Sequence, residues 1–167
     1  MKKAVACLGL ALLTLPILAG AAMADCTDPP RPGADWRRCV MDGRVFDGAD
    51  LTGANLRDVR LNQASLREAT LAGIDGRRAR ALGSDFTGAD LSGANMTGAD
   101  LSRAVFAGAT LVETDLRRTK LFRANLRDAD LTGARLDGAD FLGADLSGAT
   151  WTDGTTVCSE GSVGICE

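Results

Sequence analysis

The sequence predicts an all-β solenoid that is capped at both ends, and three observations support this fold class. Large apolar residues recur at every fifth position from Phe46 to Trp151, and 20 of these 22 positions hold Leu, Phe, Met or Trp. Alanine occupies 16 of the positions two residues before them, and glycine occupies 12 of the positions two residues after them. The cysteines all lie outside this repeat. A chain of 167 residues has room for one such domain.

Residues 1–24 are predicted to be a cleaved signal peptide. Met1–Lys3 gives a basic start, Ala4–Leu18 is apolar apart from one threonine, and Ala22-Met23-Ala24 is typical of a signal peptidase site. The apolar stretch is shorter than the roughly 20 residues of a membrane span, which disfavours an uncleaved anchor. Cleavage removes two lysines and no acid, leaving 17 basic and 22 acidic residues and a net charge of −5. We therefore expect an exported protein, periplasmic or secreted, without a membrane anchor after cleavage.

Residues 25–43 are predicted to form an N-terminal cap. Three prolines, Pro29, Pro30 and Pro32, disfavour a strand that pairs on both sides. Trp36 and Met41 nevertheless keep the five-residue phase, so the first coil can begin irregularly within this segment.

Residues 44–153 are predicted to form the solenoid itself. A helix would spread every fifth residue around its surface, and each internal glycine would cost about 1 kcal/mol. An uninterrupted strand would send successive large residues to opposite faces. A short extended segment with a turn every five residues resolves both conflicts, because the glycine then sits at a corner where a positive φ is required. Gly76 and Ala81 are the two exceptions among the large residues, and we interpret them as a degenerate repeat rather than a bulge.

Consecutive five-residue units carry a family resemblance. Ala89-Asp90-Leu91-Ser92-Gly93 and the two units that follow it resemble the pentapeptide-repeat family, whose pattern is Ala-(Asp/Asn)-Leu-x-x. The resemblance implies a right-handed quadrilateral parallel β-helix with four pentapeptides per coil and about five to six coils. At the usual strand spacing of about 4.8 Å per layer, such a stack is roughly 25 Å tall.

Residues 154–167 lose the repeat and are predicted to form a C-terminal cap, with Trp151 closing the last coil. The mature chain keeps four cysteines, Cys26, Cys39, Cys158 and Cys166, which allow three disulfide connectivities. If the ends of the solenoid are about 25 Å apart, pairing from end to end exceeds the reach of a disulfide. We therefore predict Cys26–Cys39 and Cys158–Cys166 as structural disulfides, one at each end.

Residues 20 apart stack on successive coils in such a solenoid, and outward-facing positions then form columns. One face gathers basic residues that either bind an anionic, phosphate- or carboxylate-bearing envelope polymer or are solvated and paired with aspartates. A second column holds three apolar residues, which either mark a patch for a protein partner or are isolated surface side chains. The basic residues are Arg57, Arg60, Arg77, Arg78, Arg80, Arg117, Arg118 and Lys120, and the apolar residues are Leu82, Phe122 and Leu142.

The amino-acid composition argues against several classes of function. The chain has no histidine, which removes the commonest general base, the usual zinc ligand and every Ser-His or Cys-His pair. Its acidic balance and few aromatic residues argue against nucleic acid binding. We predict a non-enzymatic scaffold or interaction protein with no cofactor and no metal, whose partner is another protein or an anionic envelope polymer. One alternative, implied by the resemblance, is a DNA-mimicking inhibitor of a DNA topoisomerase. Another is a hydrolase that uses paired carboxylates.

Overall fold

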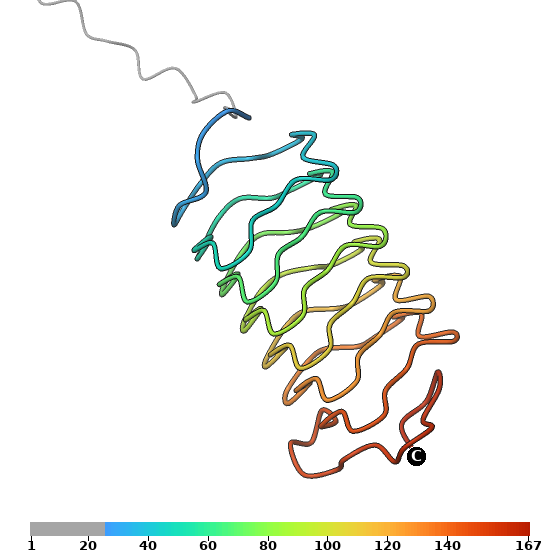
Figure 1. Cartoon of the computed structure of the whole chain (residues 1–167). Helices are drawn as coiled ribbons and strands as arrows, with labels where there is room; N and C mark the ends of the chain where they lie inside the picture. The colour runs from blue at the N-terminus through green and yellow to red at the C-terminus, as the bar shows by residue number, and fades with distance from the viewer. Residues whose placement is uncertain (1–25) are drawn as a thin grey trace, which may run out of the picture.

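The computed structural model describes residues 26–167, which wind into an elongated solenoid with the two ends of this segment at opposite ends of the stack (Figure 1). Within this segment the chain forms no helix and no strand longer than one bridging residue. Bridging residues recur at every fifth position from Asp35 to Thr150, and parallel bridges join positions 20 residues apart, from Asp35↔Asn55 to Asp130↔Thr150. The predicted signal peptide lies outside the described residues.

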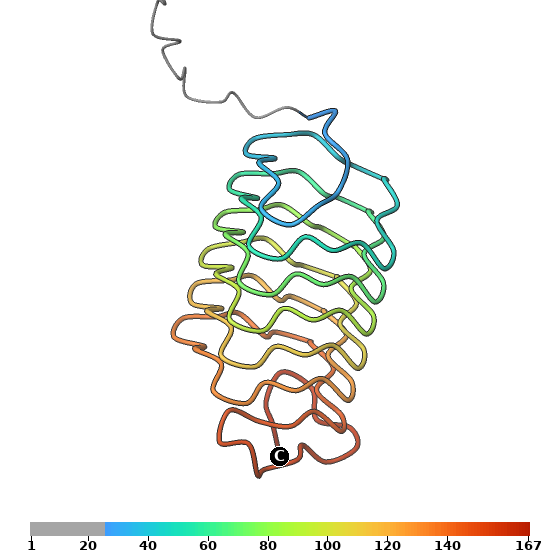
Figure 2. The same ribbon diagram turned by 90° about the vertical axis from the view of Figure 1, so that its left-hand side faces the viewer.

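The coils are stacked one above the next (Figure 2), and backbone hydrogen bonds join each coil to its neighbours. The N–H of a central residue donates to the next coil, as Leu91 N does to Thr110 O at 2.8 Å. The N–H of the preceding residue donates to the previous coil, as Asp90 N does to Ala69 O at 3.0 Å. An offset of 20 residues equals four pentapeptides, which agrees with the four-sided coil that the resemblance implies; the number of coils stays a prediction.

Each corner is a four-residue turn with a positive φ at its third residue. The turn after Leu91 is closed by a hydrogen bond of 3.0 Å from Ala94 N to Leu91 O, and Gly93 has φ +63°. The third residue has a positive φ at all 24 such corners from Gly33 to Gly148, including ten that are not glycine. The repeated turn therefore sets the backbone conformation even where the residue type disfavours it.

The core contains the central residues together with the small residues two positions before them. Leu91, Leu101 and Leu126 are fully buried, and the Phe86 and Phe106 rings stack with centroids 4.8 Å apart. Where the small position is polar, its hydroxyl donates to a central carbonyl of the previous coil, as in Ser84, Thr114 and Thr119. Buried hydroxyl groups are thus satisfied without interrupting the stack.

The two exceptional core positions keep the regular backbone. Gly76 N donates to Asn95 O and Ala81 N donates to Asp100 O, each at 2.8 Å, so the ladder has no bulge there. A Cβ at Gly76 would lie only 2.4 Å from Met96 Sδ, which shows that the Met96 side chain extends into the space that Gly76 leaves.

Both ends carry irregular segments. The regular bridges begin at Asp35, within the segment 25–43 that the sequence analysis assigned to a cap, and Trp36 packs against Phe46 with ring centroids 5.0 Å apart. At the other end the chain turns back and forms two antiparallel bridges, Thr150↔Val157 and Asp145↔Val163. The last coil is therefore closed by a different pairing from the one that joins the inner coils.

Candidate functional site

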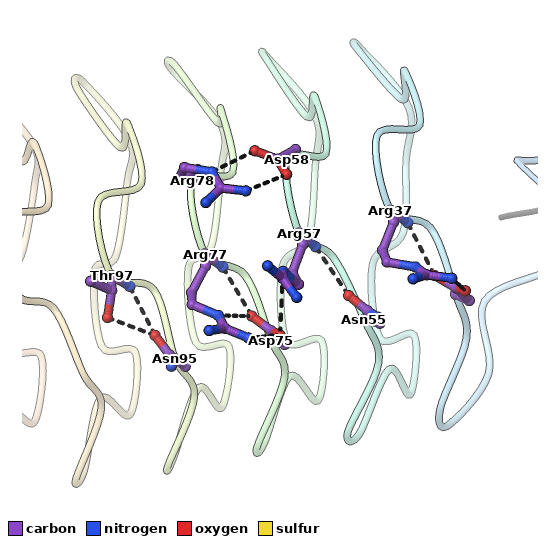
Figure 3. Close-up of polar contacts among 10 residues, drawn as sticks. Arg37, Asn55, Arg57, Asp58, Asp75, Arg77, Arg78, Asn95 and Thr97 are labelled. Carbon is purple, nitrogen blue, oxygen red and sulfur yellow. Dashed lines mark hydrogen bonds and ion pairs between the residues drawn. The ribbon is translucent and has the colours of Figure 1, made fainter.

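The aspartates and asparagines that precede the central residues have a structural role. Their Oδ1 atoms accept the backbone N–H two residues later, as Asp90 does from Ser92 and Asp85 from Thr87, each at 2.9 Å. Figure 3 shows this contact repeated at Asn55, Asp75 and Asn95 on successive coils. The ladder between coils does not use this N–H, so the side chain satisfies it locally. The sequence analysis did not identify this role, although the recurrence of Asp or Asn at one position of the repeat is its signal.

Six of the eight basic residues predicted to form a face are engaged in ion pairs. Arg77 and Arg117 each form a short pair with the aspartate two residues before, at 2.7 and 2.6 Å. Arg78 binds Asp58 of the previous coil through two hydrogen bonds of 2.8 and 2.7 Å (Figure 3). The remaining three pairs are Arg57–Asp75 at 3.8 Å, Lys120–Asp100 at 3.5 Å and Arg60–Asp42.

These pairs keep the carboxylates ionised. The hydrogen bond from Arg117 lowers the pKa of Asp115 to about 2, and the hydrogen bond from Arg77 lowers the pKa of Asp75. The pKa of Asp58 is lowered in the same way by Arg78. Much of this face is therefore neutralised internally, and only its unpaired members are available to an external anion.

A groove of about 630 Å³ crosses this face at Gly98, which has no side chain and leaves a gap in the column of side chains. Gly98 follows Arg78 in one column, and it carries no side chain to fill the space above that arginine. The groove is lined by Asp58, Arg60, Asn62, Arg78, Ala79, Arg80, Leu82, Gly98, Asp100 and Lys120. Four of these side chains are basic and two are acidic, so the groove has a positive balance in a protein that is negative as a whole.

Arg80 is the basic residue of this groove that has no acidic partner. It is bridged to Arg60 on one side and to Asp100 on the other, but Arg60 pairs with Asp42 and Asp100 pairs with Lys120. Within residues 26–167 the exposed Arg80 side chain makes no hydrogen bond or ion pair. Arg118 likewise makes none within that segment, but it does not line the groove. The structure thus brings Arg60, Arg78, Arg80 and Lys120 together and leaves the other four predicted residues outside the groove.

The predicted apolar patch is discontinuous. Leu82 is 45% exposed and lines the groove, whereas Leu142 is 68% exposed and lies near the C-terminal end. Phe122 is partly buried, and the Arg123 guanidinium lies over its ring at 5.1 Å from the centroid. Ser102 occupies the position between Leu82 and Phe122 in this column, so the three apolar side chains do not form one surface.

The four cysteines form the two pairs expected from the sequence. Cys26–Cys39 joins Cα atoms 5.4 Å apart at the N-terminal end, and Cys158–Cys166 joins Cα atoms 4.8 Å apart at the C-terminal end. Cys39 and Cys158 are buried, so each disulfide ties an irregular segment to the core of the solenoid. No three His, Cys, Asp or Glu residues among residues 26–167 are grouped to hold a metal ion. In the same part of the chain there is no apolar helix of membrane-spanning length.

A family profile matches the repeated part of this chain. The sequence profile described as pentapeptide repeats matches eight copies, over residues 33–63, 45–80, 60–98, 84–121 and 124–150. A comparison with curated protein sequences finds no match.

Among solved structures, the chain is similar to QnrB1, a plasmid-mediated fluoroquinolone resistance protein, with 24% identity and a TM-score of 0.39. The match covers 71% of this chain and 63% of QnrB1, so this chain spans less than two thirds of that protein. It is also similar to a pentapeptide repeat protein from the thylakoid lumen of Arabidopsis thaliana, with 26% identity over 78% of this chain and 85% of that one, at a TM-score of 0.33. A third similar structure, a pentapeptide repeat protein from Nostoc PCC 7120, has 37% identity over 52% of this chain and 67% of that one, at a TM-score of 0.36.

Proposed function

Because the chain belongs to the pentapeptide-repeat family, we propose that it is a non-enzymatic binding scaffold, a right-handed quadrilateral β-helix of five to six coils. The scaffold presents the groove around Arg80 to an anionic group, either phosphate or carboxylate, of a polymer or protein partner. The observation that carries this proposal is the unpaired Arg80 among three further basic side chains in a groove.

The recognition chemistry follows from the contrast between Arg80 and its neighbours. Arg78 is already held by two hydrogen bonds to Asp58, which use two of the five N–H donors of its guanidinium and fix its orientation. Arg80 retains all five N–H donors of its guanidinium, whose planar fork matches the geometry of a phosphate or carboxylate. Arg60 is bridged to Arg80, and Lys120 is bridged to Asp100 on the far side of Arg80. Both side chains add positive potential to the same groove.

We further propose that the protein acts outside the cytoplasm, in the periplasm or as a secreted protein. The basic, apolar and small-residue segments of residues 1–24 support export. The two disulfides support an oxidising compartment, where such bonds form and persist. In that compartment, the anionic ligand would belong to a component of the cell envelope.

Titration with two anionic polymers tests the proposed binding. The purified protein is titrated with inorganic polyphosphate and, separately, with polygalacturonate, and binding is measured by calorimetry at about 50 mM salt. Arg80→Ala is expected to weaken binding about tenfold, because hydrogen bonds between charged groups are among the strongest in proteins. The polymer that binds more tightly identifies phosphate or carboxylate as the preferred group.

Arg118→Ala is the matched control, since Arg118 is also exposed and unpaired within residues 26–167 but lies outside the groove. It is expected to weaken binding less than about threefold, as a general change of one charge does. Equal losses for the two variants, or no binding of either polymer by the unaltered protein, would contradict the proposal. The acidic DNA-mimic alternative has no comparable support, because this groove interrupts the acidic surface with four basic residues.

A further inference from the structure

The C-terminal end of the solenoid is only partly covered by the tail (Figures 1 and 2). The tail pairs antiparallel with the two sides of the last coil that contain Asp145 and Thr150. On these sides Leu146 N donates to Ser162 O and Gly148 N donates to Cys158 O, each at 2.9 Å. The tail thus replaces the next coil along half of this edge.

The other two sides of the last coil, within residues 134–143, form no bridge with the tail, although Gly164 of the tail lies beside Phe141 and Gly143. In the inner coils the N–H groups of the central and corner residues donate to the following coil, as Leu116 N and Arg118 N do. At this end, by contrast, the four N–H groups of the central and corner residues on these two sides have no acceptor within residues 26–167, and the carbonyls of Ala134 and Ala139 have no donor there. The four N–H groups belong to Leu136, Gly138, Phe141 and Gly143.

The same two sides expose apolar surface. Leu136 and Phe141 are partly buried, whereas Leu116 and Leu121, which hold the same positions one coil earlier, are each 1% exposed. Leu142 follows Phe141 and is 68% exposed. An edge that combines open hydrogen-bonding groups with apolar side chains is a template for an additional strand.

The charge around this edge indicates which kind of strand it accepts. Residues 134–167 contain six acidic side chains and one basic side chain, Arg135, which lies 3.9 Å from Asp115 of the previous coil. Asp137 and Asp140 lie on the two unbridged sides themselves, both are exposed, and neither has an ion pair within residues 26–167. A second copy that approached with the same edge would bring like charges together, whereas a basic segment would be attracted.

We propose that this edge, formed by residues 134–143, binds an extended basic segment of a partner protein by strand addition. The segment runs antiparallel to the coil, as the tail does on the neighbouring sides. Its carbonyls accept the four open N–H groups, its N–H groups reach Ala134 O and Ala139 O, and its basic side chains lie near Asp137 and Asp140. This surface shares no residue with the Arg80 groove, so a negative result for one proposal does not affect the other.

A capped hexapeptide of alternating lysine and valine, (Lys-Val)₃, is the probe for this proposal. It is titrated into the ¹⁵N-labelled protein at low salt, and amide chemical shifts and hydrogen exchange are followed by NMR. We expect the shift changes and the new protection to concentrate at Leu136, Gly138, Phe141 and Gly143. The peptide (Glu-Val)₃ and a lysine–valine peptide with prolines at alternate positions, which cannot donate along a ladder, are expected not to bind.

The charge contribution is tested with D137N/D140N, which keeps the shape of both side chains. This variant is expected to bind (Lys-Val)₃ about threefold to tenfold more weakly. D90N/D130N, which removes the same charge from inner coils, is the matched control and is expected to bind as the unaltered protein does. Three results would overturn the proposal: shift changes spread over the whole solenoid, equal binding of the glutamate peptide, or concentration-dependent shifts of the same amides without peptide.

Discussion

At the scale of single residues, the corners show how a repeated turn overrides residue preference. The third residue of every turn from Gly33 to Gly148 has a φ between +55° and +71°, although ten of these residues carry a side chain. A residue with a Cβ is strained in this conformation by about 1–2 kcal/mol, and aspartate or asparagine less so. The solenoid tolerates this strain because each inner corner is fixed by ladder hydrogen bonds to both neighbouring coils.

Two opposite substitutions at corners test this balance. Gly93 has φ +63° and open space where a Cβ would lie, so Gly93→Ala should lower the free energy of unfolding by about 1 kcal/mol through strain alone. Arg103→Gly, at φ +59°, should leave it unchanged or raise it by up to about 1 kcal/mol, because relief of strain exceeds the added chain entropy. Urea denaturation measures both changes. Arg103→Ala is the control, since it keeps the strained Cβ, and a stabilisation equal to that of Arg103→Gly would contradict the explanation.

At the scale of the five-residue element, the sequence pattern correctly predicted which residues are buried, because burial depends on the local period. The central residues, such as Leu91, and the small residues, such as Ala94, are buried as the period requires. The four sides of the coil did not follow from the period and came from the family resemblance. The pairing of Arg78 with Asp58 depends on a side chain reaching across to the previous coil, which the pattern of one chain does not specify. For this reason the sequence left open whether the basic face binds an anion or is paired with aspartates, and the structure pairs six of its eight residues.

The pair of Gly76 and Met96 shows that two elements share one core space. Gly76→Leu should lower the free energy of unfolding by about 1–3 kcal/mol, because its side chain would overlap Met96, which approaches a Cβ at Gly76 to 2.4 Å. Met96→Ala should lower it by about 2–5 kcal/mol by leaving a cavity. In the double variant the leucine occupies that cavity, so the combined loss should be smaller than the sum by at least about 1 kcal/mol.

Chemical denaturation of the two single variants and the double variant measures this coupling. Gly76→Leu combined with Leu131→Ala, a buried position more than two coils away, is the control pair and should be additive within about 0.5 kcal/mol. Additive effects for Gly76 and Met96 as well would show that the two side chains do not compete for the same space.

At the scale of the whole molecule, stability depends on the ends. Each inner coil contacts only its two neighbours, so unfolding can begin at a terminal coil and progress along the stack. The sequence indicated that residues 154–167 leave the repeat but not which sides of the last coil they cover, because that coverage follows from long-range antiparallel pairing. The Cys158–Cys166 disulfide constrains this tail where Cys158 is buried against the last coil.

Removing this disulfide should therefore loosen one end of the solenoid before the rest. C158A/C166A is expected to lower the free energy of unfolding by about 2–3 kcal/mol, since the cross-link closes a loop of about eight residues. Hydrogen exchange should accelerate most at Leu146 and Gly148, whose N–H groups donate to the tail, while Leu91 keeps its protection. C26A/C39A, the equivalent change at the opposite end, is the control and should leave exchange at Leu146 and Gly148 unaltered. Uniformly faster exchange along the chain in C158A/C166A would show instead that the solenoid unfolds as one cooperative unit and that its ends have no separate stability.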